Sequence, residues 1–285
     1  MQTPRNPLVT PKVVWGVDYS GAALSGHTAW YAVTSPARGG RLRLDELGPL
    51  SHLCGGLDRA TVNAGLVEAI RESRDALWAL NFPFGLPAEA LPDGVASWPS
   101  QFRYLATWGD AAYPWGLGCV AQSQARGLGM HVRRVTDAAQ KTPFDAYHYR
   151  IVYQTFHGLR DVIDPLRRDR ETCILPFQPR KLATAARVVV ESCPTITLRR
   201  LGLPSRNFKQ PTGGPLTPLR RRTRRAILDG LAAYVTIPPS LARRAMRDPG
   251  ADGLDAIVSA VGAWTVRKHA VAFTARIRRE GWHYA

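Results

Sequence analysis

Residues 13–22 read VVWGVDYSGA. An apolar run, VVWGV, ends in Asp18, and the small residues Ser20, Gly21 and Ala22 follow. This pattern predicts a buried strand that ends in a carboxylate and then opens into a turn. In open α/β sheets, ligands bind beyond the carboxyl ends of such strands. The stretch therefore predicts an α/β fold with a ligand site at Asp18.

The segments that follow predict a sheet built around this first strand. Residues 27–34 (HTAWYAVT) are rich in strand-forming residues, and residues 41–44 (RLRL) alternate, which predicts an edge strand. Residues 57–74 carry apolar side chains at helical spacing. Residues 75–81 (DALWALN) predict a buried strand that ends at Asn81. Three antiparallel strands, a crossover helix and a fourth strand parallel to the first form the opening of an RNase H-like sheet.

The rest of the chain completes this sheet after an interruption. Residues 88–180 hold few strand signals and predict a mostly helical insertion. The sheet resumes at residues 186–190 (ARVVV), which end in Glu191, and residues 252–266 predict the last clear helix. We therefore predict an α/β fold with an RNase H-like mixed five-stranded sheet and flanking helices. Residues 1–285 would form a single domain with a helical insertion at about 88–180.

The charge of the chain indicates a polyanionic partner. The 38 Lys and Arg residues outnumber the 22 Asp and Glu residues, which gives a net charge of +16. A basic surplus of this size most simply predicts binding to nucleic acid. The alternative is a protein that is only generically basic, as in some genomes where Arg replaces Lys.

The cysteines and the apolar segments of the sequence indicate the cellular compartment of the protein. The four cysteines form no CxxC pair, which is typical of a reducing compartment and of neither a disulfide framework nor a structural zinc site. Residues 1–11 contain three prolines and predict an extended tail without the apolar core of a signal peptide. No apolar run reaches the roughly 18 residues that span a bilayer. We predict a cytoplasmic protein that does not contact membranes.

Acidic residues begin or end three of the predicted elements. Asp18 ends the first strand and Glu191 ends the fifth, while Asp252 and Asp255 lie one turn apart at the start of the last helix. Asp252 could serve only as an N-cap. Asp255 has apolar sequence neighbours, so we expect it to be half buried and to need a partner or a metal ion.

Converging carboxylates of this kind can support metal chemistry. Hard ions such as Mg²⁺ prefer oxygen ligands. Two such ions about 4 Å apart can activate a water and stabilise the leaving oxygen of a phosphodiester. Asn81 stands where a further acid would be expected. Its amide oxygen can ligate a metal without offsetting the charge of the ion, and the alternative is a turn former before a proline loop.

Five motifs in this order and spacing are GVDYSG (16–21), NFPFGLP (81–87), VVVESCP (188–194), DGLDAIVSAVGAW (252–264) and EGW (280–282). Together they resemble a large uncharacterised family of predicted nucleases with the RNase H-like fold. The D-x-x-D-A helix is also similar to the C-terminal helix of Holliday-junction resolvases. The resemblance spans nearly the whole chain and implies a metal site formed by Asp18, Glu191, Asp252 and Asp255.

The chain departs from this family at two positions. The family usually has Asp in the segment where this chain has Asn81, and its members often carry an acid where this chain has Thr195. The first departure puts one metal ligand, and with it full two-metal activity, in question.

Two groups of arginines predict contacts with nucleic acid. Five lie in the first turns of a helix predicted at residues 219–235, where they oppose the helix dipole; they are Arg220, Arg221, Arg222, Arg224 and Arg225. Arginines at this end destabilise the helix without an evident structural gain, which indicates a function for them. The alternative is that they form a solvated basic face. Arg133 and Arg134 lie near aromatic residues of the insertion, a combination that suits single-stranded nucleic acid. Core packing is the alternative use of those aromatic rings.

We therefore predict a nuclease that uses Mg²⁺ or Mn²⁺ to hydrolyse phosphodiester bonds of DNA or RNA. Asp18 would bridge the metal ions, Glu191 and Asp255 would complete the site, Asp252 would assist and Asn81 would be a further ligand. The alternative is a non-catalytic nucleic-acid-binding protein with a degenerate RNase H-like site. A phosphotransferase of the actin and sugar-kinase kind would need a second phosphate loop in a duplicated domain, and the sequence contains no duplication.

Overall fold

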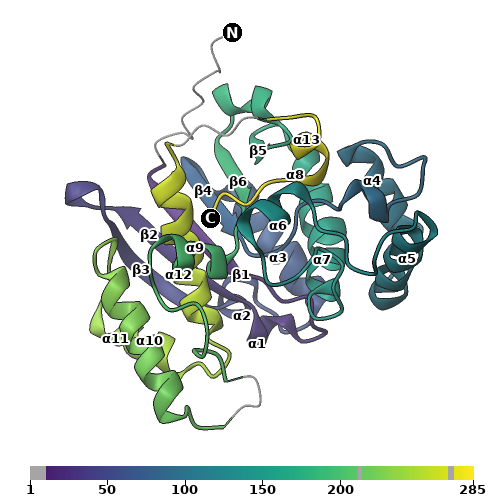
Figure 1. The fold of residues 1–285 in the computed structure, drawn as a ribbon. Coiled ribbons are helices and arrows are strands. Elements are labelled where there is room, and N and C mark those ends of the chain that lie inside the picture. Colours follow the sequence, from purple (N-terminus) through teal and green to yellow (C-terminus); the bar gives the residue numbers. More distant parts are fainter. Residues whose placement is uncertain (1–10, 211–213, 269–272) are drawn as a thin grey trace.

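A seven-stranded mixed sheet forms the centre of the molecule, with strand order β5-β6-β4-β1-β2-β3-β7 (Figure 1). The structure is a computed structural model that describes residues 11–210, 214–268 and 273–285. The extended tail predicted at residues 1–11 lies outside the described residues except for Pro11.

The first four strands have the predicted arrangement. β1 (Val13–Asp18) pairs antiparallel with β2 (Trp30–Pro36), which pairs antiparallel with β3 (Leu42–Pro49). On its other side β1 pairs parallel with β4 (Ala76–Leu80), which the chain reaches through helix α3 (Arg59–Glu72). Three antiparallel strands and a parallel fourth strand beside the first are therefore confirmed.

The prediction of five strands is wrong, because each edge of the sheet gains one strand. β4 pairs parallel with β6 (Arg187–Glu191), and β6 pairs parallel with β5 (Thr172–Leu175). On the far side, β7 (Val235–Thr236) pairs with β3. The segment 41–44 is therefore not at an edge. β5 has four residues and β7 has two, which is too short to show a strand periodicity in the sequence.

The segment between β4 and β5 is mostly helical. Its main helices are α4 (Trp98–Ala106), α5 (Ala112–Ala125), α6 (Val135–Gln140), α7 (Val152–His157) and α8 (Asp164–Arg168). A π-helical segment, Gly158–Ile163, joins α7 to α8. Within the described parts of the chain, no helix is both long and apolar enough to cross a membrane.

Helices cover both faces of the sheet, so its inner strands are buried on both sides. All five residues of β4 (ALWAL) are buried. Because successive strand residues point to opposite faces, Trp78 and Leu80 join the core formed with α3, α4, α5 and α7. Leu77 and Ala79 join the second core. That core contains residues of α9 (Pro194–Arg200), α10 (Pro218–Leu231), α11 (Pro239–Arg247) and α12 (Asp252–Val266).

Helix α12 packs directly on β1 and has the bounds that the sequence predicts. A Cβ atom on Gly16 would lie 1.9 Å from the carbonyl oxygen of Ala256 and 2.6 Å from the amide nitrogen of Ala260. Only glycine permits this approach of the two backbones. The N-cap is Ala251, so Asp252 is not a capping residue but the first residue of the helix. The close packing brings the first turn of α12 to the end of β1, where Asp18 lies (Figure 1).

Candidate functional site

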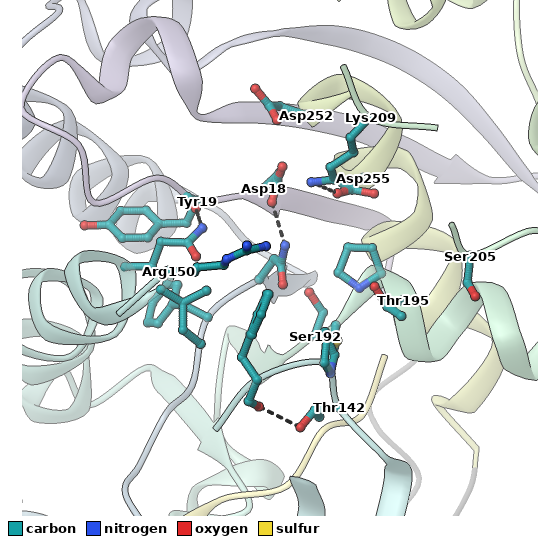
Figure 2. Close-up of a pocket in the computed structure, with 18 of the residues that line it drawn as sticks. Asp18, Tyr19, Thr142, Arg150, Ser192, Thr195, Ser205, Lys209, Asp252 and Asp255 are labelled. Atoms are coloured by element: carbon teal, nitrogen blue, oxygen red, sulfur yellow. Dashed lines mark hydrogen bonds and ion pairs between the residues drawn. The ribbon is translucent and has the colours of Figure 1, made fainter. Parts of the chain in front are cut away.

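A cavity of about 740 Å³ opens beyond the carboxyl ends of β1, β4 and β6. Asp18, Asn81 and Ser192 follow or end these three strands and line it. Asp252 and Asp255 enter from the first turn of α12 (Figure 2). The cavity therefore lies at the edge of the sheet where α/β folds bind ligands.

Three carboxylates and one ammonium group meet in this cavity. Asp18 is 5% exposed and Asp255 is 2% exposed. Nζ of Lys209, from the loop between α9 and α10, lies 2.5 Å from Oδ2 of Asp255. Nδ2 of Asn81 donates a hydrogen bond of 2.6 Å to Oδ1 of Asp18. Figure 2 shows Lys209 directed toward Asp255 on the side that faces Asp18, with Asp252 beyond them.

The carboxylates perturb one another's protonation. Burial raises the pKa of Asp18 well above its ordinary value, and repulsion by Asp255 and Asp252 adds to this effect against the attraction of Lys209. Burial also raises the pKa of Asp255. Burial, followed by repulsion from Asp248, raises the pKa of Asp252 to about 7. Like charges held this close in a buried site favour the binding of positive charge.

The oxygen atoms of the site suit a hard divalent cation. Oδ1 of Asp255 is buried and has no hydrogen-bond partner among the described residues. A buried carboxylate oxygen without a partner is unfavourable, and Mg²⁺ or Mn²⁺ would satisfy it. In the ranges that the structure describes, no three His, Cys, Asp or Glu side chains are close enough together to hold a metal ion. The oxygen donors thus suit the ion by their chemistry but are not arranged around one position, and the ammonium group of Lys209 lies against Asp255.

Glu191 is not part of this group. It is fully buried at the end of β6, and Arg134 donates to both of its carboxylate oxygens at 2.6 and 2.9 Å. The amide of Phe84 donates to Oε2 at 2.9 Å. The side chain of Glu191 does not line the cavity. The structure therefore brings together Asp18, Asn81, Asp252 and Asp255 but leaves Glu191 in a separate buried ion pair.

Two of the arginines expected to contact nucleic acid are buried, which corrects that prediction. Arg134 is 0% exposed and also pairs with Asp137 at 2.9 Å. Arg224 is 0% exposed, and its guanidinium donates to the carbonyl oxygens of Phe208 and Pro249, each at 2.7 Å. Both guanidinium groups donate hydrogen bonds to internal partners and are not accessible to an external ligand.

The other predicted arginines are accessible. Arg133, Arg221, Arg222 and Arg225 are exposed, and Arg220 is half buried in the wall of the cavity.

A second hollow, of about 610 Å³, extends the basic surface onto α11. Arg221 and Arg225 line it together with Arg243 and Arg247. The same Arg243 and Arg247 line a third hollow, of about 520 Å³, with Arg244. The arginines of α10 and α11 therefore form one basic surface, which we call the α10–α11 arginine surface.

Sequence reasoning missed Lys209 and the arginines of α11. Lys209 is a single lysine in a polar loop, and no periodic pattern marks it. Arg243 and Arg247 are four residues apart, a spacing that puts two side chains on one helical face. That signal was present in the sequence.

Comparison with known proteins adds one match. Residues 16–276 match the family model described as "Protein of unknown function (DUF429)". The matched segment contains the cavity residues Asp18, Asn81, Lys209, Asp252 and Asp255. No curated protein and no solved structure matches the chain.

Proposed function

The chain belongs to the DUF429 family, whose description assigns no activity, and we propose from the geometry of its site that it is a divalent-metal-dependent nuclease. The observation that carries this proposal is the convergence of Asp18, Asp252 and Asp255 in one cavity. Their raised pKa values and the unpartnered Oδ1 of Asp255 favour a bound cation. The net charge of +16 favours a polyanionic substrate.

We also propose that the fold is RNase H-like. The order β3-β2-β1-β4-β6 supports this assignment, since β1 to β3 are antiparallel and β4 and β6 run parallel to β1. In this interpretation β5 and β7 are additions at the two edges of the sheet.

The residues of the site have distinct roles in this proposal. Asp18, Asp252 and Asp255 would supply oxygen ligands to the ion, which requires them to come closer together than the described side chains lie. Asn81 orients Asp18 through its amide hydrogen bond. A bound Mg²⁺ or Mn²⁺ would lower the pKa of a water molecule and offset charge on the phosphate. Arg150 and Arg220 line the same cavity and can donate to phosphate oxygens.

The test is a cleavage assay on single-stranded, duplex, hybrid and branched nucleic acids with Mg²⁺ or Mn²⁺. We expect Asp18→Asn to lower the cleavage rate by at least about 100-fold, the scale of losing one electrostatic group from an active site. Asp93→Asn is the matched control, because the Asp93 side chain is 98% exposed and lies outside the cavity. Cleavage that survives Asp18→Asn would overturn the proposal.

A nucleic-acid-binding protein without catalytic activity is the second candidate. It is favoured by Asn81, an amide where the resembling family usually has an acid. It predicts salt-dependent binding without cleavage. Cleavage that appears only in Asn81→Asp would favour this second candidate over a working nuclease.

The cytoplasm is the proposed location. All four cysteines are free thiols, which is usual for proteins of a reducing compartment.

A further inference from the structure

We propose that the site takes single-stranded nucleic acid, with an unpaired base stacked on aromatic rings beside the cavity and Arg150 on the adjoining phosphate. The rings belong to Phe144, His148 and Tyr149, from the loop between α6 and α7, and we call them the aromatic patch. The inference rests on the proposed function and specifies the class of its substrate.

The rings of the aromatic patch form a row that extends from the cavity wall to solvent. Phe144 lines the cavity. The ring centre of His148 lies 4.6 Å from that of Phe144 and 4.4 Å from that of Tyr149. Tyr149 is 60% exposed, so much of its ring surface meets solvent. Apolar side chains gathered at an exposed surface mark binding sites, and aromatic rings are the surfaces on which nucleobases stack.

Arg150 supplies positive charge next to these rings. Its guanidinium carbon lies 5.7 Å from the centre of the Phe144 ring and 5.8 Å from the centre of the Tyr149 ring. Arg150 also lines the cavity, and Figure 2 shows it directed into the space where Asp18 lies. A base stacked on the patch therefore has its phosphate within reach of an arginine that faces the acids. Aromatic rings with arginine beside them are the combination that binds single strands.

The loop that carries the aromatic patch is held in place from its inner side. The buried carboxylate of Asp145 pairs with His131 at 2.8 Å. The hydroxyl group of the buried Tyr147 accepts a hydrogen bond from the amide of Val132 at 2.7 Å and donates to the carbonyl oxygen of Met130 at 3.0 Å. A surface that is already ordered loses less conformational entropy when its ligand binds.

The depth of the acids favours a single strand over a duplex. Asp18 and Asp255 are both buried, so a phosphodiester has to enter the cavity to reach them. Duplex DNA is stiff, with a persistence length of about 50 nm, and its bases are stacked on one another. A single strand can bend into the cavity and offers free base faces to the rings.

The test is fluorescence anisotropy with the full chain in the presence of a chelator, so that binding is measured without cleavage. The probes are oligothymidylate and oligouridylate of about 12 nucleotides, a DNA duplex of the same length, and a strand with the same number of phosphates but no bases. We expect oligothymidylate or oligouridylate to bind at least about 5-fold more tightly than the abasic strand, the lower limit for one stacked base. We also expect the better of the two to bind more tightly than the duplex.

Variants separate the effect of the ring from the effect of the charge. Tyr149→Ala should weaken binding of the normal strand by about 5-fold or more and leave the abasic strand unchanged. Tyr149→Phe keeps the ring and should bind as the wild type does. Arg150→Gln should weaken both strands, because a phosphate contact does not depend on the bases. Tyr113→Ala is the matched control, since Tyr113 is 48% exposed on α5 and does not line the cavity, and it should change neither affinity.

The outcomes separate this inference from the proposed function. Equal affinity for the normal and the abasic strand, tighter binding of the duplex, or no binding of any probe would overturn the inference whatever the protein cleaves. An equal effect of Tyr149→Ala on the normal and the abasic strand would overturn it as well. Base-dependent binding without any cleavage in the presence of Mg²⁺ or Mn²⁺ would overturn the nuclease and leave the inference standing.

Discussion

Arg134 links Asp137 and Glu191 in a cluster whose three side chains are at most 2% exposed. Replacing Arg134 by Met would remove the guanidinium that pairs with both buried carboxylates and leave them, among the described side chains, only the ring of His283, 3.0 Å from an oxygen of each. We expect it to lower the free energy of unfolding by about 3–5 kcal/mol. Arg133→Met is the control, because Arg133 is exposed, and we expect a change within about 0.5 kcal/mol. Urea unfolding measures both. Equal and small losses would mean that the buried cluster does not stabilise the fold.

Asp252 makes the stability of the metal-free protein depend on pH. Its pKa is raised to about 7 in the folded state, mainly by burial and then by Asp248. An unfolded aspartate titrates near about 3.9. Between these values the folded protein holds a proton that the unfolded chain has released, so stability falls as pH rises from about 4 through about 7. Asp18, whose pKa is also raised by burial, acts in the same direction.

The measurement is the melting temperature in the presence of a chelator between pH 5 and pH 8. We expect it to fall with rising pH in the wild type and to fall less in Asp252→Asn. Identical slopes for the two proteins would contradict the assignment to Asp252.

At the scale of residues, the sequence predicts where acidic side chains lie in the fold better than it predicts which residues form ion pairs or hydrogen bonds with buried side chains. Asp18, Glu191, Asp252 and Asp255 were predicted because each lies at one end of a strongly patterned element, and all of them except Glu191 line the cavity. The burial of Arg134 and Arg224 could not be predicted, since their partners are distant in sequence: Glu191 for the first and Pro249 for the second. The position of Lys209 beside Asp255 depends on the same kind of long-range contact.

At the scale of elements, the contact between β1 and α12 controls the geometry of the site. Gly16→Ala would push a Cβ atom into the carbonyl group of Ala256, so the helix must move away from the strand. We expect a loss of about 1–3 kcal/mol of stability together with weaker Mn²⁺ binding, because Asp255 moves relative to Asp18. Gly94→Ala is the control, since a Cβ there meets no atom within 4 Å. Unchanged Mn²⁺ affinity in Gly16→Ala would argue against this coupling.

The predicted elements differ in how well the sequence specifies them. The long apolar helix 252–266 was predicted with its true bounds, and β1 and β4 were found because apolar runs bounded by polar residues mark buried strands. β5 and β7 were missed because their pairing with β6 and β3, and not their own composition, makes them strands.

At the scale of the whole molecule, the α10–α11 arginine surface differs from other basic parts of the protein in that some of its arginines have no acidic partner among the described residues. Arg168 pairs with Asp164, and Arg74 lies near Glu171. Arg221 and Arg243 have no ion pair with a carboxylate among the residues that the structure describes. The proposed nucleic-acid partner would therefore contact these arginines without displacing a carboxylate.

The corresponding prediction concerns salt. The double variant Arg221→Gln/Arg243→Gln should weaken nucleic-acid binding and reduce the slope of log K against log salt by about 2, one for each phosphate that is no longer neutralised by an arginine. Arg74→Gln/Arg168→Gln removes the same net charge elsewhere and should keep the slope. Fluorescence anisotropy at several salt concentrations measures both, and equal slopes for the two doubles would show that net charge alone determines binding.

The packing of β1 against α12 also has a consequence during synthesis. Asp18 leaves the ribosome early, but Asp252 and Asp255 follow roughly 230 residues later, which takes about 12–47 s at about 5–20 residues per second. Until that helix emerges, the nascent chain carries one carboxylate of the trio and no assembled centre. Under the proposed function, the protein is thus translated beside messenger and ribosomal RNA in an inert form, and translation that stops before Asp252 yields a fragment without the proposed site.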